Sequence, residues 1–213
     1  MKTIRKKHHY TLIEIMTVIV IATILFAIGI PAFSTMIQGS NMTMAIRQLS
    51  AKLQAARAYA VTNRCRVAVL LVENEADVKP EYRFSAYRVC RIYSSDTKWL
   101  DWIEDEDWKT LPKGVLRTAL PATGPVTISN LQASGVSMLG PTAAFDIKAI
   151  VFDARGQLVS DDSITINFRQ GRYVENNVIY TERNGDGKIV NHPIVINKYT
   201  GKIKVPDITA SDS

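Results

Sequence analysis

The pattern of hydrophobic and polar residues begins with a long apolar run. Between Leu12 and Ile30 the chain has nineteen residues, of which Glu14 is the only charged one. As a helix this run reaches about 28 Å, close to the hydrocarbon thickness of a bilayer. A buried core helix and a secretory signal are the alternatives, but the apolar region of a signal is usually about 7–15 residues long. We therefore expect a membrane-spanning helix over residues 10–30.

The helical pattern continues beyond this run, over residues 31–62. Pro31 predicts a kink or a curved hinge. Polar residues such as Arg47, Lys52 and Arg57 share one face, and we expect that face to meet water or another subunit. The opposite face should pack on a sheet, because apolar residues recur on it every three or four positions. They are Met42, Ile46, Leu49, Leu53, Ala56 and Ala60.

From residue 63 to residue 213 the pattern is that of β-structure. We expect a hairpin around the polar loop at residues 73–81, and long surface loops between Pro121 and Pro141. The fold class is therefore α+β: a long N-terminal helix, transmembrane and then amphipathic, packed on an antiparallel β-sheet or sandwich head. The predicted strands are Arg66–Val72, Tyr82–Tyr93, Ile147–Asp153, Ser163–Phe168, Asn177–Thr181, Ile189–Asn197 and Lys202–Val205.

The distribution of charge indicates how the N-terminus is oriented. The chain of 213 residues has a formal charge of +6, and four of the excess positive charges lie in residues 1–9. Such a basic leader in front of an apolar helix places the N-terminus in the cytoplasm and the following domain outside. From Tyr10 onward only 22 basic residues face 20 acidic ones, so the overall charge is mainly a topology signal.

Four segments carry a family resemblance. The sequence YTLIEIM from Tyr10, behind a Lys/Arg leader, resembles the N-terminal signal of type IV pilins and type II secretion pseudopilins. The segments Leu49–Val69, Ala149–Leu158 and Ile194–Val205 resemble the H-type minor pseudopilin and related minor pilins. The resemblance implies a structural subunit, not an enzyme, for assembly or initiation of a pilus or a secretion pseudopilus.

The resemblance also implies partners and a location. The partners are other pilins or pseudopilins through the N-terminal helix, a prepilin peptidase, the inner-membrane assembly platform and the lipid bilayer. The chain would span the inner membrane once, with a cytoplasmic N-terminus and a periplasmic head, before it enters a pilus or pseudopilus or reaches the cell surface. We expect no cofactor.

Four residues receive roles from the resemblance. Cleavage is expected between His9 and Tyr10, followed by N-methylation of Tyr10, although the family has Gly where this chain has His9. Glu14 and Pro31 are expected to act in assembly, with the Glu14 carboxylate neutralising the new amine of a neighbouring subunit. The alternative for Glu14 is a carboxylate near the interface that the positive end of the helix dipole stabilises.

Cys65 and Cys90 are the only cysteines. Equal counts outward from residues 76–79 place Cys65 opposite Cys90, so a cross-strand disulfide in an oxidising compartment is one expectation. Two buried thiols are the other. A metal site is not expected, because the spacing of the cysteines and the single downstream His192 do not fit a zinc cluster.

Two further features raise other functions. Tryptophans and acids alternate in Trp99–Trp108, which predicts either an acidic recognition loop or a loop anchored on the core by its tryptophans. DNA capture during uptake is the alternative function, because phosphate contacts dominate nucleic-acid binding. The basic C-terminal residues that would form its patch are Arg183, Lys188, Lys198, Lys202 and Lys204.

Overall fold

The computed structural model describes residues 11–74, 78–93, 97–104, 106–131, 139–140, 145–174 and 177–211. The chain divides into two compact units, Met1–Ser40 and Asn41–Ser213. In its described residues the first unit is helical, as the N-terminal part of α1 (Leu12–Asn63). Among the described residues, no helix has both the length and the apolar character needed to cross a membrane.

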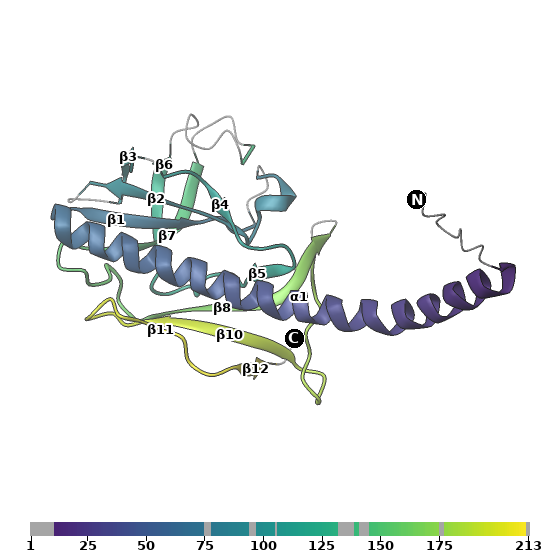
Figure 1. Cartoon of the computed structure of the whole chain (residues 1–213). Coiled ribbons are helices and arrows are strands. Elements are labelled where there is room, and N and C mark those ends of the chain that lie inside the picture. Colours follow the sequence, from purple (N-terminus) through teal and green to yellow (C-terminus); the bar gives the residue numbers. More distant parts are fainter. Residues whose placement is uncertain are drawn as a thin grey trace, which may run out of the picture. The chain divides into compact units, whose positions relative to one another are not determined.

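The second unit is the head, which contains the rest of α1, a short 3-10 helix and all the strands that the structure describes (Figure 1). The expected α+β class is confirmed. The elements after α1 are β1 (Arg66–Leu71), η1 (Pro80–Tyr82), β2 (Ala86–Ile92), β3 (Trp99–Trp102), β4 (Lys109–Thr110), β5 (Val115–Arg117), β6 (Val126–Leu131), β7 (Phe145–Phe152), β8 (Ile164–Val174), β9 (Asn177–Tyr180), β10 (Ile189–Ile196), β11 (Ile203–Lys204) and β12 (Thr209–Ser211).

The strands form two sheets, and every pairing between two named strands that the structure describes is antiparallel. The first sheet has the order β3-β2-β1-β7-β6, with β4 also paired to β2. The second has the order β11-β10-β8-β5, with β12 paired to β10 and β9 paired to β8. In the view of Figure 1, β1, β2, β3 and β6 of the first sheet are drawn above the C-terminal part of α1, and β10, β11 and β12 of the second sheet are drawn below it. Hairpins explain the antiparallel pairs of consecutive strands, such as β1–β2 and β6–β7.

The first sheet also curls so that its two ends approach each other. Lys98, next to β3, forms a parallel bridge with Ser129 of β6. The backbone N–H of Ser129 donates to the carbonyl oxygen of Thr97 at 3.4 Å. The strands at the two ends of the sheet are therefore neighbours in space.

Two hydrophobic cores use opposite faces of the first sheet. Along β1, Val67 and Val69 contribute to the core beneath α1, whereas Ala68 and Leu70 contribute to the second core on the other face. A strand buried on both faces needs apolar residues at every position, which explains why residues 67–72 show no alternation. The β8 and β10 strands complete the core beneath α1 with Ile164, Ile166, Phe168, Ile194 and Ile196.

The amphipathic part of α1 packs as predicted. Leu49, Leu53 and Ala60 are fully buried, and the 3.6-residue period places them on one side of the helix. Ile46 is only partly buried, while Ala45 takes a fully buried place beside the stripe. The backbone of α1 remains helical through Pro31.

The second strand begins later than predicted, at Ala86 instead of Tyr82. The chain first forms η1 and then a turn in which Phe84 has a φ of 55°. This turn is held by Arg83, whose Nε donates to the carbonyl oxygen of Val78 at 2.9 Å. A residue with positive φ interrupts an extended strand, so residues 82–85 do not join β2.

The expectation of loops throughout residues 121–141 is wrong for β6. Ile128 and Leu131 are fully buried in the second core. Val126 and Ile128 alternate with Thr127 and Ser129, which is the period of a strand, although Gly, Pro and Ser residues around them point to loops. The segment forms a strand because Ile128 and Leu131 become buried when it pairs with β7.

Candidate assembly surface

The first unit exposes an apolar helix surface. Leu12, Phe26 and Met36 have 79%, 66% and 74% of their surface exposed, and most described side chains between them are similarly open. Glu14 is the only charged residue between Thr11 and Ile46. Exposed apolar surface of this extent is typical of a site for lipid or for other protein chains.

The start of α1 is capped by Thr11, which was not among the predicted site residues. The hydroxyl of Thr11 accepts a hydrogen bond from the backbone N–H of Glu14 at 3.3 Å. The T-x-x-E spacing of Thr11 and Glu14 is that of a capping box and could have revealed this role. Within the helix, the hydroxyls of Thr17 and Thr23 donate to the carbonyl oxygens of Ile13 and Ile19, both at 2.8 Å. These hydroxyls are therefore satisfied without water.

The other residues expected to act at the N-terminus are placed only in part. Glu14 is exposed in the first turn of α1, where the positive end of the helix dipole favours a carboxylate. The backbone of Pro31 is part of the same helix. His9 and Tyr10 lie outside the described residues.

The two cysteines are not cross-strand partners. In the β1–β2 register Cys90 lies opposite Ala68, three residues away from Cys65. Both thiols are free. Burial raises the pKa of the fully buried Cys90 and that of the half-buried Cys65 above their ordinary values. The expected pairing of Cys65 with Cys90 is therefore corrected to two thiols in separate environments.

The five basic residues expected to form one DNA-binding patch fall into two groups. Arg183 and Lys188 lie before β10, and the Nη1 of Arg183 donates to the carbonyl oxygen of Gly187 at 2.7 Å. Lys198, Lys202 and Lys204 lie in the β10–β11 hairpin at the other end of β10. An eight-residue strand spans about 26 Å, so the structure does not bring the two groups together.

The tryptophan-rich segment is anchored on the head. Trp108 is buried, and Trp99 and Trp102 belong to β3. Three basic side chains pair with its acids: Lys52 contacts Glu106 at 2.5 Å, Arg91 contacts Asp101, and Arg88 contacts Asp107 at 3.7 Å. Arg88 also stacks on Trp102, with 3.8 Å between Cζ and the ring centroid. This arrangement fits the expectation of tryptophan anchors better than that of an acidic recognition loop.

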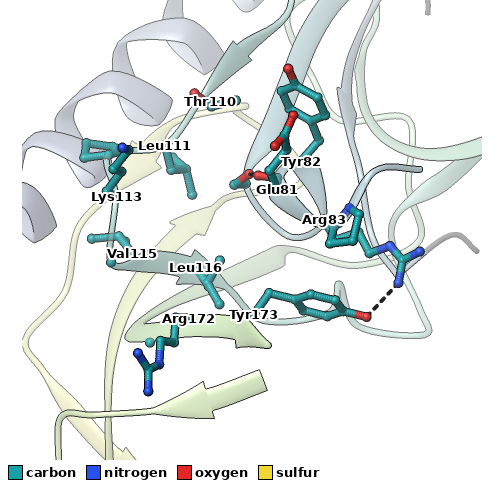
Figure 2. Close-up of a pocket in the computed structure, with 15 residues that line it drawn as sticks. Glu81, Tyr82, Arg83, Thr110, Leu111, Lys113, Val115, Leu116, Arg172 and Tyr173 are labelled. Atoms are coloured by element: carbon teal, nitrogen blue, oxygen red, sulfur yellow. Dashed lines mark hydrogen bonds between the residues drawn. The ribbon is translucent and has the colours of Figure 1, made fainter. Parts of the chain in front are cut away.

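A hollow of about 730 Å³ opens between η1, residues 110–116 and the end of β8 (Figure 2). Figure 2 shows Arg83 directed toward Tyr173, and the Nη1 of Arg83 donates to the hydroxyl of Tyr173 at 2.8 Å. That hydroxyl donates to Oδ1 of Asn74 at 2.6 Å. The residues that line the hollow include no histidine or cysteine.

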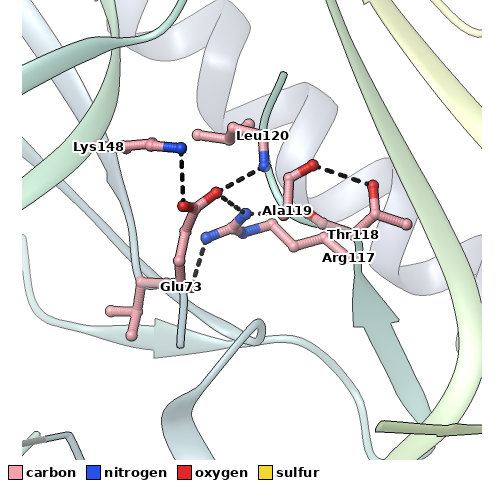
Figure 3. Close-up of polar contacts among 7 residues, drawn as sticks. Glu73, Arg117, Thr118, Ala119, Leu120 and Lys148 are labelled. Carbon is pink, nitrogen blue, oxygen red and sulfur yellow. Dashed lines mark hydrogen bonds and ion pairs between the residues drawn. The ribbon is translucent and has the colours of Figure 1, made fainter. Parts of the chain in front are cut away.

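A polar network joins residues of β5 and β7 to the segment that follows β1 (Figure 3). Glu73, just after β1, accepts hydrogen bonds from the backbone N–H of Leu120 at 2.6 Å and from Nζ of Lys148 in β7 at 3.0 Å. Arg117 at the end of β5 lies 3.6 Å from Oε1 of Glu73 and donates to the carbonyl oxygens of Val72 and Thr118. Neither Glu73 nor Arg117 was predicted from the sequence, although Arg117 interrupts an apolar run and such a buried charge requires partners.

The head and the amphipathic part of α1 match a known family. The family model of the type II transport protein GspH matches residues 45–182, about two thirds of the chain. No curated protein matches the chain.

Solved structures also match, with low similarity. The type IV minor pilin FimU of Pseudomonas aeruginosa is 16% identical, with 78% of this chain and 87% of that chain covered and a TM-score of 0.43. The minor pseudopilin EpsH from the Type 2 Secretion System of Vibrio cholerae is 10% identical, with 77% and 94% covered and a TM-score of 0.43.

The GspH match spans the amphipathic part of α1 and most of the head. Members of this family are structural subunits and not enzymes. They assemble with other pseudopilins at the inner membrane or in the pseudopilus. The chain belongs to the GspH family, the minor pseudopilins of type II secretion and the related minor pilins.

Proposed function

We propose that the chain starts or extends a pseudopilus by inserting its N-terminal helix among the helices of neighbouring subunits. A prepilin peptidase cuts between His9 and Tyr10, and the new N-terminus of Tyr10 is methylated. Before assembly, residues 10–30 are held in the inner membrane with the head in the periplasm, and the assembly platform moves the subunit from there into the filament.

The exposed apolar surface of α1 carries this proposal. The large apolar side chains described between Leu12 and Ile37 are mostly open to the surroundings and not covered by the chain itself. Each large apolar side chain that becomes buried contributes about 1.5–3 kcal/mol, so packing among helices or lipid tails is strongly favourable. The satisfied hydroxyls of Thr17 and Thr23 remove a cost that free polar groups would add in such surroundings.

Glu14 gives this packing its register. A carboxylate in an apolar helix bundle costs about 2.5–3.5 kcal/mol unless it has a partner. The amine created at Tyr10 of a neighbouring subunit supplies that partner. A subunit displaced along the filament axis would leave two unpaired buried charges, so only one axial position is favoured.

The test replaces Glu14 in the full chain, expressed with the other pseudopilins of its secretion system. We expect Glu14→Gln to insert in the membrane normally but to lower the amount of co-purified pseudopilin at least tenfold. Glu104→Gln is the matched control, because Glu104 is also exposed but lies in the head. Equal co-purification of the two variants would contradict the proposed role.

Processing is tested separately by the intact mass of the membrane-extracted chain. We expect a species that begins at Tyr10 and carries one additional methyl group. His9→Gly restores the family's residue before the junction and should increase the processed fraction. A chain that still begins at Met1 in both variants would exclude peptidase processing.

A further inference from the structure

Three segments far apart in the sequence meet at the end of the head where α1 terminates. They are the last turns of α1, the turn after β7 and the β10–β11 hairpin. The Nε of Arg57 donates to the carbonyl oxygen of Gly156 at 3.0 Å, and the N–H of Leu158 donates to that of Lys198 at 3.0 Å. These contacts fix the backbone beneath the surface side chains. A surface fixed in this way loses little conformational freedom when it binds a partner.

This end contains a hollow of about 570 Å³ with charges of both signs. Arg66, Arg155 and Lys198 line it together with Asp153 and Asp161. Arg155 has 79% of its side chain exposed, so its 3.3 Å ion pair with Asp153 is solvated and contributes little. Within the part of the chain that the structure describes, the guanidinium of Arg66 has no hydrogen-bond or ion-pair partner. Both guanidinium groups are therefore available to an incoming carboxylate.

An exposed aromatic side chain lies beside the hollow. Tyr199 is 71% exposed, and its backbone N–H donates to Oδ1 of Asn197 at 3.1 Å. The Nζ of Lys198 lies 5.5 Å from the centre of its ring. Lys202 follows on the same hairpin and is also exposed. Tyrosine and arginine are the residue types that most often provide the binding energy of protein interfaces.

We propose that this surface, the basic end (Arg66, Arg155, Lys198, Tyr199 and Lys202), binds an acidic segment on the head of a neighbouring pseudopilin. Carboxylates of that segment pair in bidentate fashion with the arginines. An apolar side chain of the same segment covers Tyr199. The inference rests on the proposed function, because that function brings the heads of neighbouring subunits together.

The mixed charge of the hollow favours a peptide over a nucleic acid. Asp153 and Asp161 line it, and Asp162 is exposed next to them. Every nucleotide of a nucleic acid carries a phosphate, and these carboxylates repel it. A peptide segment can instead place a donor group beside each aspartate and a carboxylate beside each cation.

The experiment uses the full chain in membranes that contain the other pseudopilins of its secretion system. A zero-length carbodiimide reagent joins lysine amines to carboxylates in contact, and mass spectrometry identifies the joined peptides. We expect Lys198 or Lys202 to be joined to an aspartate or glutamate of another pseudopilin. Arg155→Glu with Lys198→Glu should lower that product at least fivefold. Arg172→Glu with Lys113→Glu, an equal double charge reversal at exposed sites that line the hollow of Figure 2, should leave it unchanged.

Lys198→Arg keeps the charge but cannot react with the reagent. It should retain normal co-purification while losing products at position 198, which separates binding from any defect in folding. Pseudopilins that co-purify without any product at Lys198 or Lys202 would overturn the inference and leave the proposed function intact. If no other pseudopilin co-purified with the unmodified chain, that result would instead contradict the proposed function.

Nucleic acid is tested with the same full chain in detergent and a double-stranded oligonucleotide at two salt concentrations. We expect the oligonucleotide either not to bind or to bind equally well to a variant that carries both Lys198→Glu and Lys202→Glu. Binding that weakens with salt and disappears in this variant, together with an absence of joined peptides, would overturn the inference in favour of a phosphate ligand.

Discussion

Gly201 lies where the β10–β11 hairpin touches the turn after β7. A Cβ at this position would lie 2.0 Å from the carbonyl oxygen of Gly156 and 2.9 Å from Nε of Arg57, and the φ of Gly201 is 59°. Gly201→Ala should therefore lower the free energy of unfolding by about 2–3 kcal/mol, through strain and the loss of the Arg57 hydrogen bond. Chemical denaturation of the full chain in detergent measures this change.

Gly185→Ala is the matched control for Gly201→Ala. A Cβ at Gly185 would have no atom within 4 Å, and the φ of Gly185 is not positive. The substitution should change the free energy of unfolding by less than about 1 kcal/mol and is expected to stabilise slightly through the unfolded state. A similar loss in both variants would show that the contact of Gly201 with Gly156 is not the cause.

The thiol of Cys90 should be unreactive in the folded chain. Burial raises its pKa, and the reactive species is the thiolate, so the folded thiol stays protonated when the pH rises from 7 to 9. We expect an alkylating reagent to label Cys90 only after unfolding, and to label both cysteines then without prior reduction. If the unfolded chain took up reagent only after reduction, the two cysteines would form a disulfide.

At the level of elements, the head depends on the buried stripe of α1. Leu53 is fully buried beneath the helix, and Leu53→Ala should lower the free energy of unfolding by about 2–5 kcal/mol, through lost burial and a cavity. Gln54→Ala, one residue further on the exposed face, should change it by less than about 0.5 kcal/mol. Thermal unfolding of the two variants side by side measures the difference, and equal melting temperatures would contradict this packing.

The elements that could be predicted are those with a strong local pattern. The helix that contains the buried stripe of α1 and the apolar strand β1 were both predicted correctly, because in each the sequence pattern agrees with the burial of its residues. The short β6 was hidden among turn residues. The β1–β2 register was off by three residues, because η1 and the turn at Phe84 use residues that equal counting assigns to the second strand. Such a turn depends on tertiary contacts of Arg83 that no local pattern contains.

At the level of the whole molecule, Glu73 and Arg117 connect strands of both sheets. Arg117 is 2% exposed, so removing the charge of Glu73 leaves a buried guanidinium with less compensation. Glu73→Gln should lower the free energy of unfolding by about 3 kcal/mol. Glu81→Gln, an exposed carboxylate in η1, serves as the control and should have an effect below about 0.5 kcal/mol. A loss in the control as large as that of Glu73→Gln would contradict the role of the network.

The candidate site could be predicted only where it is continuous in the sequence. The N-terminal part of α1 is such a site, because the leader, the apolar run and Glu14 all lie in one stretch of the sequence. The five basic residues were close in sequence, but β10 separates them into two groups. Conversely, Arg66, Arg155 and Lys198 lie far apart in the sequence and meet only after the two sheets have formed. Sequence proximity and spatial proximity diverge wherever a strand intervenes.

The bridge between Lys98 and Ser129 has a consequence for a protein whose work is polymerisation. An open sheet offers unpaired backbone groups at both ends, and these can recruit strands of other molecules into amyloid-like stacks. Here the two end strands face each other, so the first sheet has less exposed edge on which such growth can start. The heads of neighbouring molecules are therefore less prone to join through the edges of this sheet, which leaves the proposed assembly through the N-terminal helix without that competing reaction.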